Sequence, residues 1–197
     1  MADLDGIADL DLGRAERRGY PEAVYCEGKT VEQVRGIAEA LRGEGGPVLF
    51  TRCLPEHLAV LREVLPEAAV DEVARLVAWP AAPPAPVGGR IVVLCAGTSD
   101  LQVAREALLT ARHLGRSAEL VVDVGVAGLH RVLGRLELIR AARCVVVVAG
   151  MDGALPSVVA GLVGAPVVAV PTSVGYGAAF EGLAALLAML NACAPGV

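Results

Sequence analysis

The chain contains few aromatic residues. Phe, Trp and Tyr make up only 3% of its 197 residues, so its core must be built from Ala, Val and Leu. Small apolar side chains of this kind favour helices packed closely on a sheet. Because 55% of the residues are hydrophobic, we do not expect a disordered chain. The length suffices for one sizeable core and a small second unit, and the apolar excess predicts contacts between subunits.

Basic clusters and long apolar runs are lacking as well. The net charge is -5, and no cluster of Lys and Arg is interleaved with aromatic residues, which argues against a nucleic-acid-binding protein. The apolar runs are shorter than the roughly 18 to 20 residues that span a bilayer, and the acidic start of the chain is unlike a signal peptide. We therefore expect a soluble, cytoplasmic protein that binds neither nucleic acid nor membranes.

The cysteines form no CxxC pair. There are five of them, an odd number, and they are widely scattered, so the sequence indicates neither a disulfide framework nor a zinc site. Cys95 and Cys144 fall in or beside apolar runs and are interpreted as small core residues. Cys26 and Cys53 receive no assignment. At the end of the last predicted helix, Cys193 is on local sequence alone more readily an inert thiol.

A proline-rich stretch at residues 80–87 separates two parts of the sequence. Closely spaced prolines adopt an extended, semi-rigid form, which is typical of a linker. We therefore predict a small N-terminal α/β domain at residues 1–79 and a larger α/β domain at residues 88–197. In the first domain we predict two helices and a strand: Val31–Leu41, Pro55–Leu65 and Pro47–Thr51. The first helix begins with a capping box formed by Thr30 and Gln33.

Apolar β-branched runs alternate with helical segments in the second half. Strands are predicted near residues 91–96, 119–124, 144–149 and 166–171. Helices are predicted near residues 100–114, 129–142, 154–163 and 180–193. This repeated order with short loops predicts a parallel sheet covered by helices on both faces. The last helix is apolar on nearly all sides, so we expect it to pack against another subunit.

Gly28, Lys29 and Thr30 look like the end of a phosphate-binding P-loop. That motif requires a further glycine five positions before Gly28, where this chain has Ala23, and an apolar strand in front of it. We therefore reject a P-loop. Lys29 either contacts a ligand phosphate or is a solvated residue at the start of a helix, and the local sequence favours the second interpretation.

Small, hydroxylated and charged residues follow the predicted strands. Thr98, Ser99 and Asp100 open the helix after the strand near 91–96, where hydroxyls and backbone N–H groups can receive a phosphate or carboxylate. The same residues also make an ordinary helix N-cap, so this turn alone leaves both interpretations open. Other polar or Gly-rich turns follow later strands: Asp152 and Gly153, Thr172 and Ser173, Gly175 and Tyr176. Because the carboxyl ends of parallel strands share one edge, the turns together predict a substrate site.

His130 and Arg131 follow two glycines, Gly125 and Gly128, which allow a ligand to approach the backbone closely. A single histidine is more often structural, but a His-Arg pair at the carboxyl end of a strand suits anion binding and proton transfer. His57 and His113 lack such a context, so we interpret them as structural.

Taken together, these motifs resemble the LarB family, whose members begin the synthesis of the nickel-pincer nucleotide cofactor of lactate racemase. The resemblance covers nearly the whole chain and rests on long motifs: Arg14–Glu22, Tyr25–Thr30, Ala96–Asp100, Asp123–Arg131, Ala149–Ser157 and Pro171–Gly177. The C-terminal half also resembles aminoimidazole ribonucleotide (AIR) carboxylases. The resemblance implies a three-layer, flavodoxin-like α/β fold for the larger domain.

The resemblance implies a carboxylase that is also a hydrolase. Its substrate would be nicotinic acid adenine dinucleotide, whose pyridinium ring gains a carboxylate from carbon dioxide or bicarbonate. Hydrolysis of the phosphoanhydride releases AMP and leaves pyridinium-3,5-biscarboxylic acid mononucleotide. Since the electron-poor ring cannot attack carbon dioxide, a cysteine thiolate first adds to it. No tightly bound cofactor or protein-held metal is implied, although a magnesium ion would neutralise charge at the phosphoanhydride.

The resemblance also assigns the site residues. By position, Cys193 matches the nucleophile of the family, and this replaces the inert assignment made from its local sequence. Asp152 stands where the family usually has Glu, so its carboxylate is retracted by one methylene. The substrate-binding residues are predicted in the strand-end turns: Thr98, Ser99, Asp100, Asp123, Gly125, His130, Arg131, Gly153, Thr172, Ser173, Gly175 and Tyr176.

The family pattern continues beyond Val197 with a segment of the type Asn-Ile-Asp-Asn-Gly-Phe-Gly-Ala, so we expect this chain to be truncated at its C-terminus. The related fold predicts a symmetric homo-oligomer resembling an octamer, assembled through the apolar last helix. Two alternative functions stay open. One is an AIR carboxylase or mutase of purine biosynthesis, which needs no thiol. The other is a nucleotide-binding module without turnover.

Overall fold

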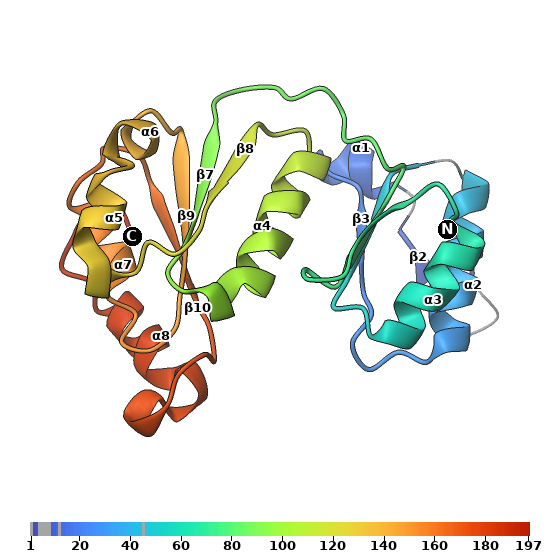
Figure 1. Ribbon diagram of the computed structural model, residues 1–197. Coiled ribbons are helices and arrows are strands. Elements are labelled where there is room, and N and C mark those ends of the chain that lie inside the picture. Colours follow the sequence, from blue (N-terminus) through green and yellow to red (C-terminus); the bar gives the residue numbers. More distant parts are fainter. Residues whose placement is uncertain (1, 4–8, 12, 45) are drawn as a thin grey trace. The chain divides into compact units, whose positions relative to one another are not determined.

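A computed structural model describes residues 2–3, 9–11, 13–44 and 46–197. The chain divides into two compact units, Met1–Pro84 and Ala85–Val197 (Figure 1). The division falls within the proline-rich stretch. Within the described residues, no helix combines the length and apolar character needed to cross a membrane.

The N-terminal unit is built on a four-stranded sheet with the order β3-β4-β6-β5. Strands β3 and β4 are parallel, whereas β6 is antiparallel to both β4 and β5. The strands and main helices are β3 (Glu22–Tyr25), β4 (Val48–Thr51), β5 (Ala69–Asp71), β6 (Leu76–Trp79), α2 (Val31–Glu44) and α3 (Pro55–Val64). The remaining elements are α1 (Arg14–Arg18) and an antiparallel pair, β1 (Ala2–Asp3) with β2 (Asp9–Leu10).

Helix α2 follows directly from its sequence pattern. Its buried residues recur at the spacing of one helical stripe: Val34, Ile37, Ala38 and Leu41. The predicted capping box is confirmed, because the Thr30 N–H donates to the Gln33 side chain at 3.0 Å and the Gln33 N–H donates to the Thr30 hydroxyl at 3.3 Å. Both helices and the strand predicted in this unit are present.

Strand β3 departs from the predictions, because it directly precedes the Gly28 turn where no strand was expected. Only Val24 of its four residues is buried, so the strand lacks the continuous apolar run by which the others were recognised.

The C-terminal unit contains a four-stranded, all-parallel sheet with the order β10-β9-β7-β8. The strands are β7 (Ile91–Cys95), β8 (Ala118–Val121), β9 (Cys144–Ala149) and β10 (Val167–Pro171). The helices are α4 (Leu101–His113), α5 (Leu129–Leu133), α6 (Leu136–Arg140), α7 (Leu155–Ala160) and α8 (Leu183–Leu190). Short 3-10 helices precede three of them: η1 (Thr98–Asp100), η2 (Val126–Gly128) and η3 (Gly177–Gly182). The predicted alternation of strands and helices is confirmed.

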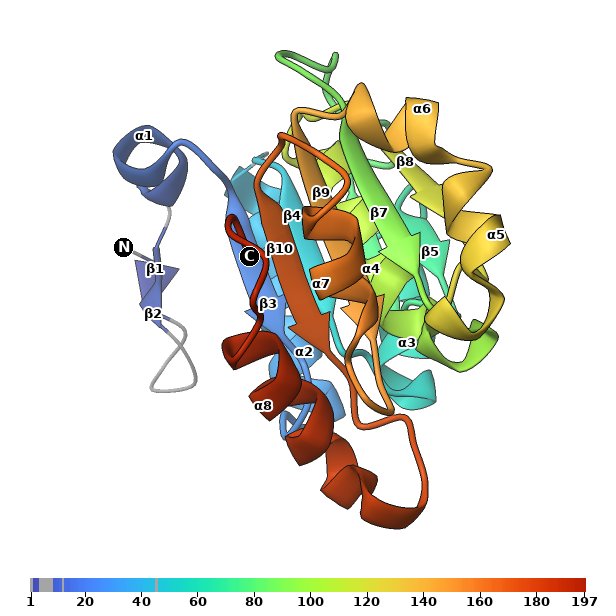
Figure 2. The same cartoon turned by 90° about the vertical axis from the view of Figure 1, so that its left-hand side faces the viewer.

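Helices cover both faces of this sheet. Helix α4 packs on one face, where Ala104 and Leu108 meet Val93 of β7. Helices α5, α6 and α7 pack on the other face together with the end of α8 (Figure 2). The predicted three-layer, flavodoxin-like fold is therefore confirmed.

Two helices differ from the predicted bounds. The helix predicted near 129–142 is two short helices, because Arg135 leaves helical geometry with φ -111° and ψ 8°. Helix α8 is shorter than predicted, because Phe180, Glu181 and Gly182 adopt positive φ values of 43°, 54° and 96° in front of it.

The strand order creates a crevice at one edge of the sheet. From β7 the chain crosses to β8 on one side and then returns to β9 on the other side of β7. Turns that leave neighbouring strands in opposite directions open a space between them, and ligands of α/β proteins bind in this space at the carboxyl ends of the strands.

Candidate active site

A pocket of about 440 Å³ opens at the carboxyl ends of β7, β8 and β9. This volume is within the range of small-molecule sites. Its lining comes from the turns after all four strands and from the start of α7: Ala96, Gly97, Ser99, Asp100, Asp123, Gly125, Val126, Ala127, Arg131, Ala149, Gly150, Met151, Asp152, Leu155 and Val174.

An ion pair stands on the β8 side of the pocket. Arg131 donates from Nη1 to a carboxylate oxygen of Asp123 at 2.5 Å, and both side chains are partly exposed. Gly128 leaves room for this guanidinium, because a Cβ at that position would lie 2.9 Å from Nη2 of Arg131. Arginine has further N–H donors beyond the one given to Asp123, so the pair can still receive an anion such as a phosphate.

Asp100, which is part of the pocket lining, forms a buried pair with Thr172. The Thr172 hydroxyl donates to one carboxylate oxygen of Asp100 at 2.6 Å, and the Gly97 N–H donates to the other at 3.0 Å. Both side chains are buried. Although sequence reasoning predicts both as substrate contacts, their polar atoms are used to connect the turn after β7 to the end of β10. They therefore hold Ser99 and the backbone of this turn in place.

Gly125 allows the turns after β7 and β8 to touch. Its N–H donates to the carbonyl of Ala96 at 2.8 Å. A Cβ at Gly125 would lie 2.9 Å from that same carbonyl oxygen, which is closer than a side chain tolerates. The glycine thus serves close backbone packing at the pocket wall.

Asp100, Asp123 and Asp152 are the carboxylates of the pocket lining. Asp123 pairs with Arg131 and Asp100 with Thr172, whereas Asp152 is bound by neither partner. It is exposed and accepts a hydrogen bond at 3.3 Å from the N–H of Ala154 within its own turn. The turn is sharp, with Met151 at φ 52° and Gly153 at φ 60°. Such a carboxylate has the freedom to accept a proton from a ligand.

Gly153, also predicted as a ligand contact, instead packs on α8. A Cβ there would lie 2.7 Å from the carbonyl oxygen of Ala185.

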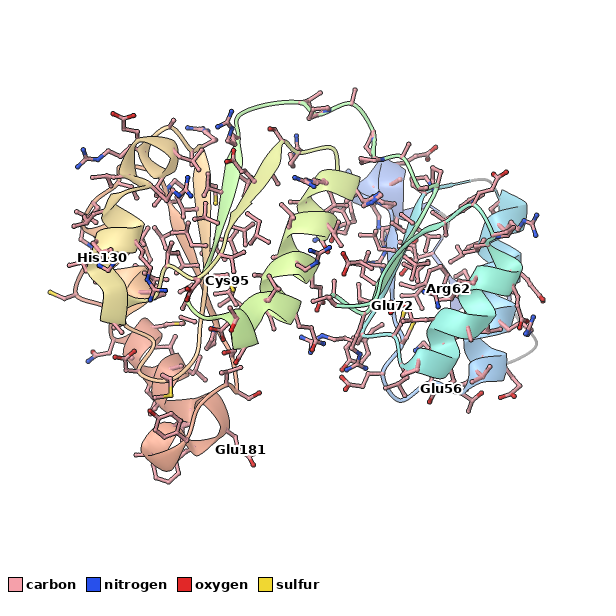
Figure 3. All side chains as sticks on the ribbon, in the orientation of Figure 1. Glu56, Arg62, Glu72, Cys95, His130 and Glu181 are labelled. Carbon is pink, nitrogen blue, oxygen red and sulfur yellow. The ribbon has the colours of Figure 1, made fainter. Side chains whose placement is uncertain are left out.

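The Cys95 thiol, which directly precedes the lining residue Ala96, is unsuited to nucleophilic attack. Cys95 lies at the end of β7 (Figure 3) and is completely buried. Its Sγ donates to the carbonyl of Gly97 at 2.9 Å. Burial raises the pKa of Cys95 to about 11, and the negative charges of Asp100 and Asp123 add to the rise. At neutral pH this sulfur therefore keeps its proton.

Several predicted residues lie near the pocket without lining it. Thr98, His130, Ser173, Gly175 and Tyr176 are all exposed, and Tyr176 reaches 81% exposure. Figure 3 shows His130 on α5, next in sequence to the lining residue Arg131. The structure thus brings only part of the predicted set into one cavity.

Cys193 is exposed, but it lies near the amino ends of the parallel strands, opposite the pocket. Helix α8 begins near Thr172, at the carboxyl end of β10, and runs back along that strand. Shortly after Cys193, the carbonyl of Gly196 accepts a hydrogen bond at 2.8 Å from the N–H of Val167, the first residue of β10. The length of a strand therefore separates Cys193 from the pocket within one chain.

Comparison with known families assigns both units. Residues 1–81 match the LarB/PurE-like N-terminal domain, and residues 90–197 match the AIR carboxylase domain. The chain belongs to the AIR carboxylase family. The N-terminal match makes it a LarB-like member, as the motifs predict. A protein of Methanocaldococcus jannaschii described as uncharacterized is 35% identical over 198 residues, which cover 95% of this chain and 75% of that relative.

Membership of the AIR carboxylase family indicates a carboxylase-type enzyme. In the described part of the chain, no group of three or more His, Cys, Asp or Glu residues could hold a metal ion. Sequence reasoning missed the apolar wall of the pocket formed by Val126, Ala127, Leu155 and Val174. All four lie within the family motifs, but their apolar side chains give no local reason to assign them to a ligand, so the fold is needed to identify them.

Proposed function

We propose that this chain carboxylates the pyridinium ring of nicotinic acid adenine dinucleotide and hydrolyses the phosphoanhydride of that substrate, with release of AMP. The observation that carries the proposal is the pocket of about 440 Å³ in a LarB-like chain, which combines an Arg131–Asp123 pair with the exposed carboxylate of Asp152. Carbon dioxide or bicarbonate supplies the new carboxylate.

In the proposed reaction, Asp152 and Arg131 have different roles. A thiolate adds to the pyridinium ring, which makes a ring carbon electron-rich enough to attack carbon dioxide. Asp152 then accepts the proton of that carbon, and the thiolate leaves as the ring regains its aromaticity. Arg131 neutralises phosphate charge while water attacks the phosphoanhydride. A magnesium ion, where one takes part, arrives with the phosphates of the substrate.

We place the reacting thiol on a second copy of the chain. Cys95 is buried and keeps its proton, while Cys193 lies at the far edge of its own sheet. In the proposal, Cys193 of one copy enters the pocket of another. Assembly is supported by apolar side chains exposed on α8 and in front of it: Phe180, Leu183, Leu186, Leu187 and Leu190. An apolar surface of this kind is typical of a subunit interface.

Incubation with nicotinic acid adenine dinucleotide and labelled bicarbonate tests the reaction. AMP and a labelled dicarboxylated mononucleotide should form in equal amounts. Recovery of unchanged substrate from the folded, assembled chain would refute the proposal. Binding of the dinucleotide in calorimetry without any product would instead favour a nucleotide-binding module.

Mixing two inactive variants tests the shared site. Neither Cys193→Ser nor Asp152→Asn should turn over alone. After the two are unfolded and reassembled together, about a quarter of the sites receive both intact groups, so about a quarter of the wild-type rate should return. If both groups acted within one chain, the mixture would stay inactive.

AIR carboxylation is the second candidate, because the AIR carboxylase match covers the whole pocket. That reaction proceeds without a sulfur nucleophile. Turnover of aminoimidazole ribonucleotide that persists in Cys193→Ser would favour it over the proposal.

A further inference from the structure

Two cysteines lie together in the core of the N-terminal unit. Cys26 directly follows β3, and Cys53 follows the parallel neighbour β4. Both side chains are completely buried and belong to the same hydrophobic cluster. The Cys26 N–H donates to the carbonyl of Thr51 at 2.9 Å, which holds the turn after β3 against the end of β4.

The backbone at Arg52 turns Cys53 towards Cys26. Tyr25 pairs with Thr51, so regular strands would place Cys26 beside Arg52 and point Cys53 to the other face. Arg52 instead adopts a left-handed φ of 55°, which breaks this alternation. As a result the Cys53 side chain lies in the same buried cluster as Cys26, where hydrogen bonding from Cys53 favours the Cys26 thiolate. Backbone strain of this kind persists only where the surroundings hold it in place.

Arg75 supplies that support. Its carbonyl accepts a hydrogen bond from the Cys53 N–H at 2.9 Å. Its side chain donates back to the carbonyl of Cys53 at 2.7 Å and to the carbonyl of Arg52 at 3.1 Å. The orientation of Cys53 is therefore fixed by contacts from a different segment of the chain.

The surroundings of the Cys26 thiol differ from those of Cys95 and Cys144. The hydrogen bond with Cys53 lowers the pKa of Cys26, and the positive charge of Lys29 lowers it further, against the effect of burial. For Cys95 and Cys144, burial raises the pKa instead. The dithiol thus contains the sulfur that most readily becomes a thiolate among these three.

We propose that Cys26 and Cys53 are a redox-active dithiol, which closes to an intramolecular disulfide when a small peroxide such as hydrogen peroxide oxidises it. Each cysteine closely follows one of two paired parallel strands, which lie about 5 Å apart, and both are buried in one cluster, so a disulfide requires only a local adjustment of the turns. Access requires only a local opening, because the residues that follow Cys26, Glu27 and Gly28, are exposed.

The oxidation proceeds in two displacements. The Cys26 thiolate attacks one peroxide oxygen, which forms a sulfenic acid, and the departing hydroxide takes up the proton of the thiol as water. The Cys53 sulfur then attacks the sulfenic sulfur and expels hydroxide, which leaves with the Cys53 proton as a second water. The two thiols lose two electrons and two protons, and the peroxide is reduced to water.

Peptide mapping of the intact protein tests this inference. After brief treatment with hydrogen peroxide and alkylation by N-ethylmaleimide, trypsin should release residues 19–29 joined to residues 53–62, at a mass about 2 Da below the sum of the two reduced peptides. Dithiothreitol should separate them. Recovery of both peptides in alkylated form, or of sulfinic and sulfonic acids without the joined pair, would overturn the proposal.

Variants locate the crosslink and supply the control. Cys26→Ala and Cys53→Ala should each abolish the joined peptides, whereas Cys144→Ala should leave them unchanged. In the wild-type protein, oxidation should also raise the unfolding midpoint by about 5 °C, because the new bond closes a loop in the unfolded chain. Joined peptides that persist in Cys26→Ala, or an oxidised protein with a lower midpoint, would contradict the assignment.

Discussion

The two units differ in the residues that follow the carboxyl ends of their parallel strands. In the N-terminal unit, the edge of β3 and β4 is filled by buried side chains: Cys26, Cys53 and His57. In the C-terminal unit, Gly97, Gly125 and Gly150 follow the strands, and a pocket of about 440 Å³ stays open. Glycines after the strands thus leave room for a ligand in the C-terminal unit, whereas larger side chains fill the corresponding space in the N-terminal unit.

His57 shows how the N-terminal edge is closed. Its Nδ1 accepts a hydrogen bond from the Leu54 N–H at 3.2 Å, so Nε2 carries the proton and donates to the carbonyl of Lys29 at 3.0 Å. One imidazole thereby joins the turns after both parallel strands. The structural role predicted for His57 agrees with these contacts.

The largest effect is expected from Asp152→Asn at the open edge. The amide cannot accept the ring proton, so turnover should fall by about 10²- to 10⁴-fold while thermal unfolding stays unchanged. Steady-state kinetics with the dinucleotide measures this. Glu137→Gln, which alters an exposed carboxylate on α6, should keep the wild-type rate. Equal losses in both variants would assign the effect to surface charge.

Gly150→Ala should disturb the packing of the turns beside the pocket. The new Cβ would lie 2.7 Å from the hydroxyl of Thr172, so the turn after β10 must move and the bond to Asp100 is disturbed. We expect the free energy of unfolding to drop by about 3 kcal/mol, as measured by chemical denaturation. An unchanged stability would mean that the turns are less closely packed than the distances indicate.

His57→Ala should remove the side chain that joins the turns after β3 and β4. It leaves the Leu54 N–H and the Lys29 carbonyl without their present partner, which should cost about 2 kcal/mol of stability. Denaturation of the full chain checks the size of the loss. A variant as stable as the wild type would show that water replaces the imidazole without cost.

The smallest effect is expected from Gly36→Ala, the matched control for Gly150→Ala. Gly36 lies inside α2, and no atom stands within 4 Å of where its Cβ would be. Alanine favours the helix, so the variant should gain about 0.5 to 1 kcal/mol. If Gly36→Ala instead destabilised the chain, the space around a glycine would not predict the effect of adding a side chain there.

The sequence predicts those parts of the fold that local patterns encode. The strands of the C-terminal unit are continuous apolar runs, and α2 has both its stripe and its cap, so their positions follow from the residues alone. Strand β5 was missed because it has only three residues and is defined by its pairing with β6, whereas β6 was missed although it is an apolar run as long as β4.

The site is harder to predict, because its contacts join distant segments. Asp100 and Thr172 stand 72 positions apart, and each looks like an independent ligand contact until the fold brings them together. The distance between Cys193 and the pocket likewise depends on the direction in which α8 returns along β10. The roles proposed for Asp152 and Cys193 stay predictions.

The protonated thiol beneath the pocket has a consequence for covalent ligands. An electrophilic fragment that enters the cavity meets in Cys95 a sulfur that is shielded by the turn above it and resists ionisation below a pH of about 11. Bond formation there is slow at neutral pH. A maleimide would therefore modify exposed Cys193 rather than Cys95, and because Cys193 is the proposed nucleophile, this modification should stop turnover while the buried thiol stays intact.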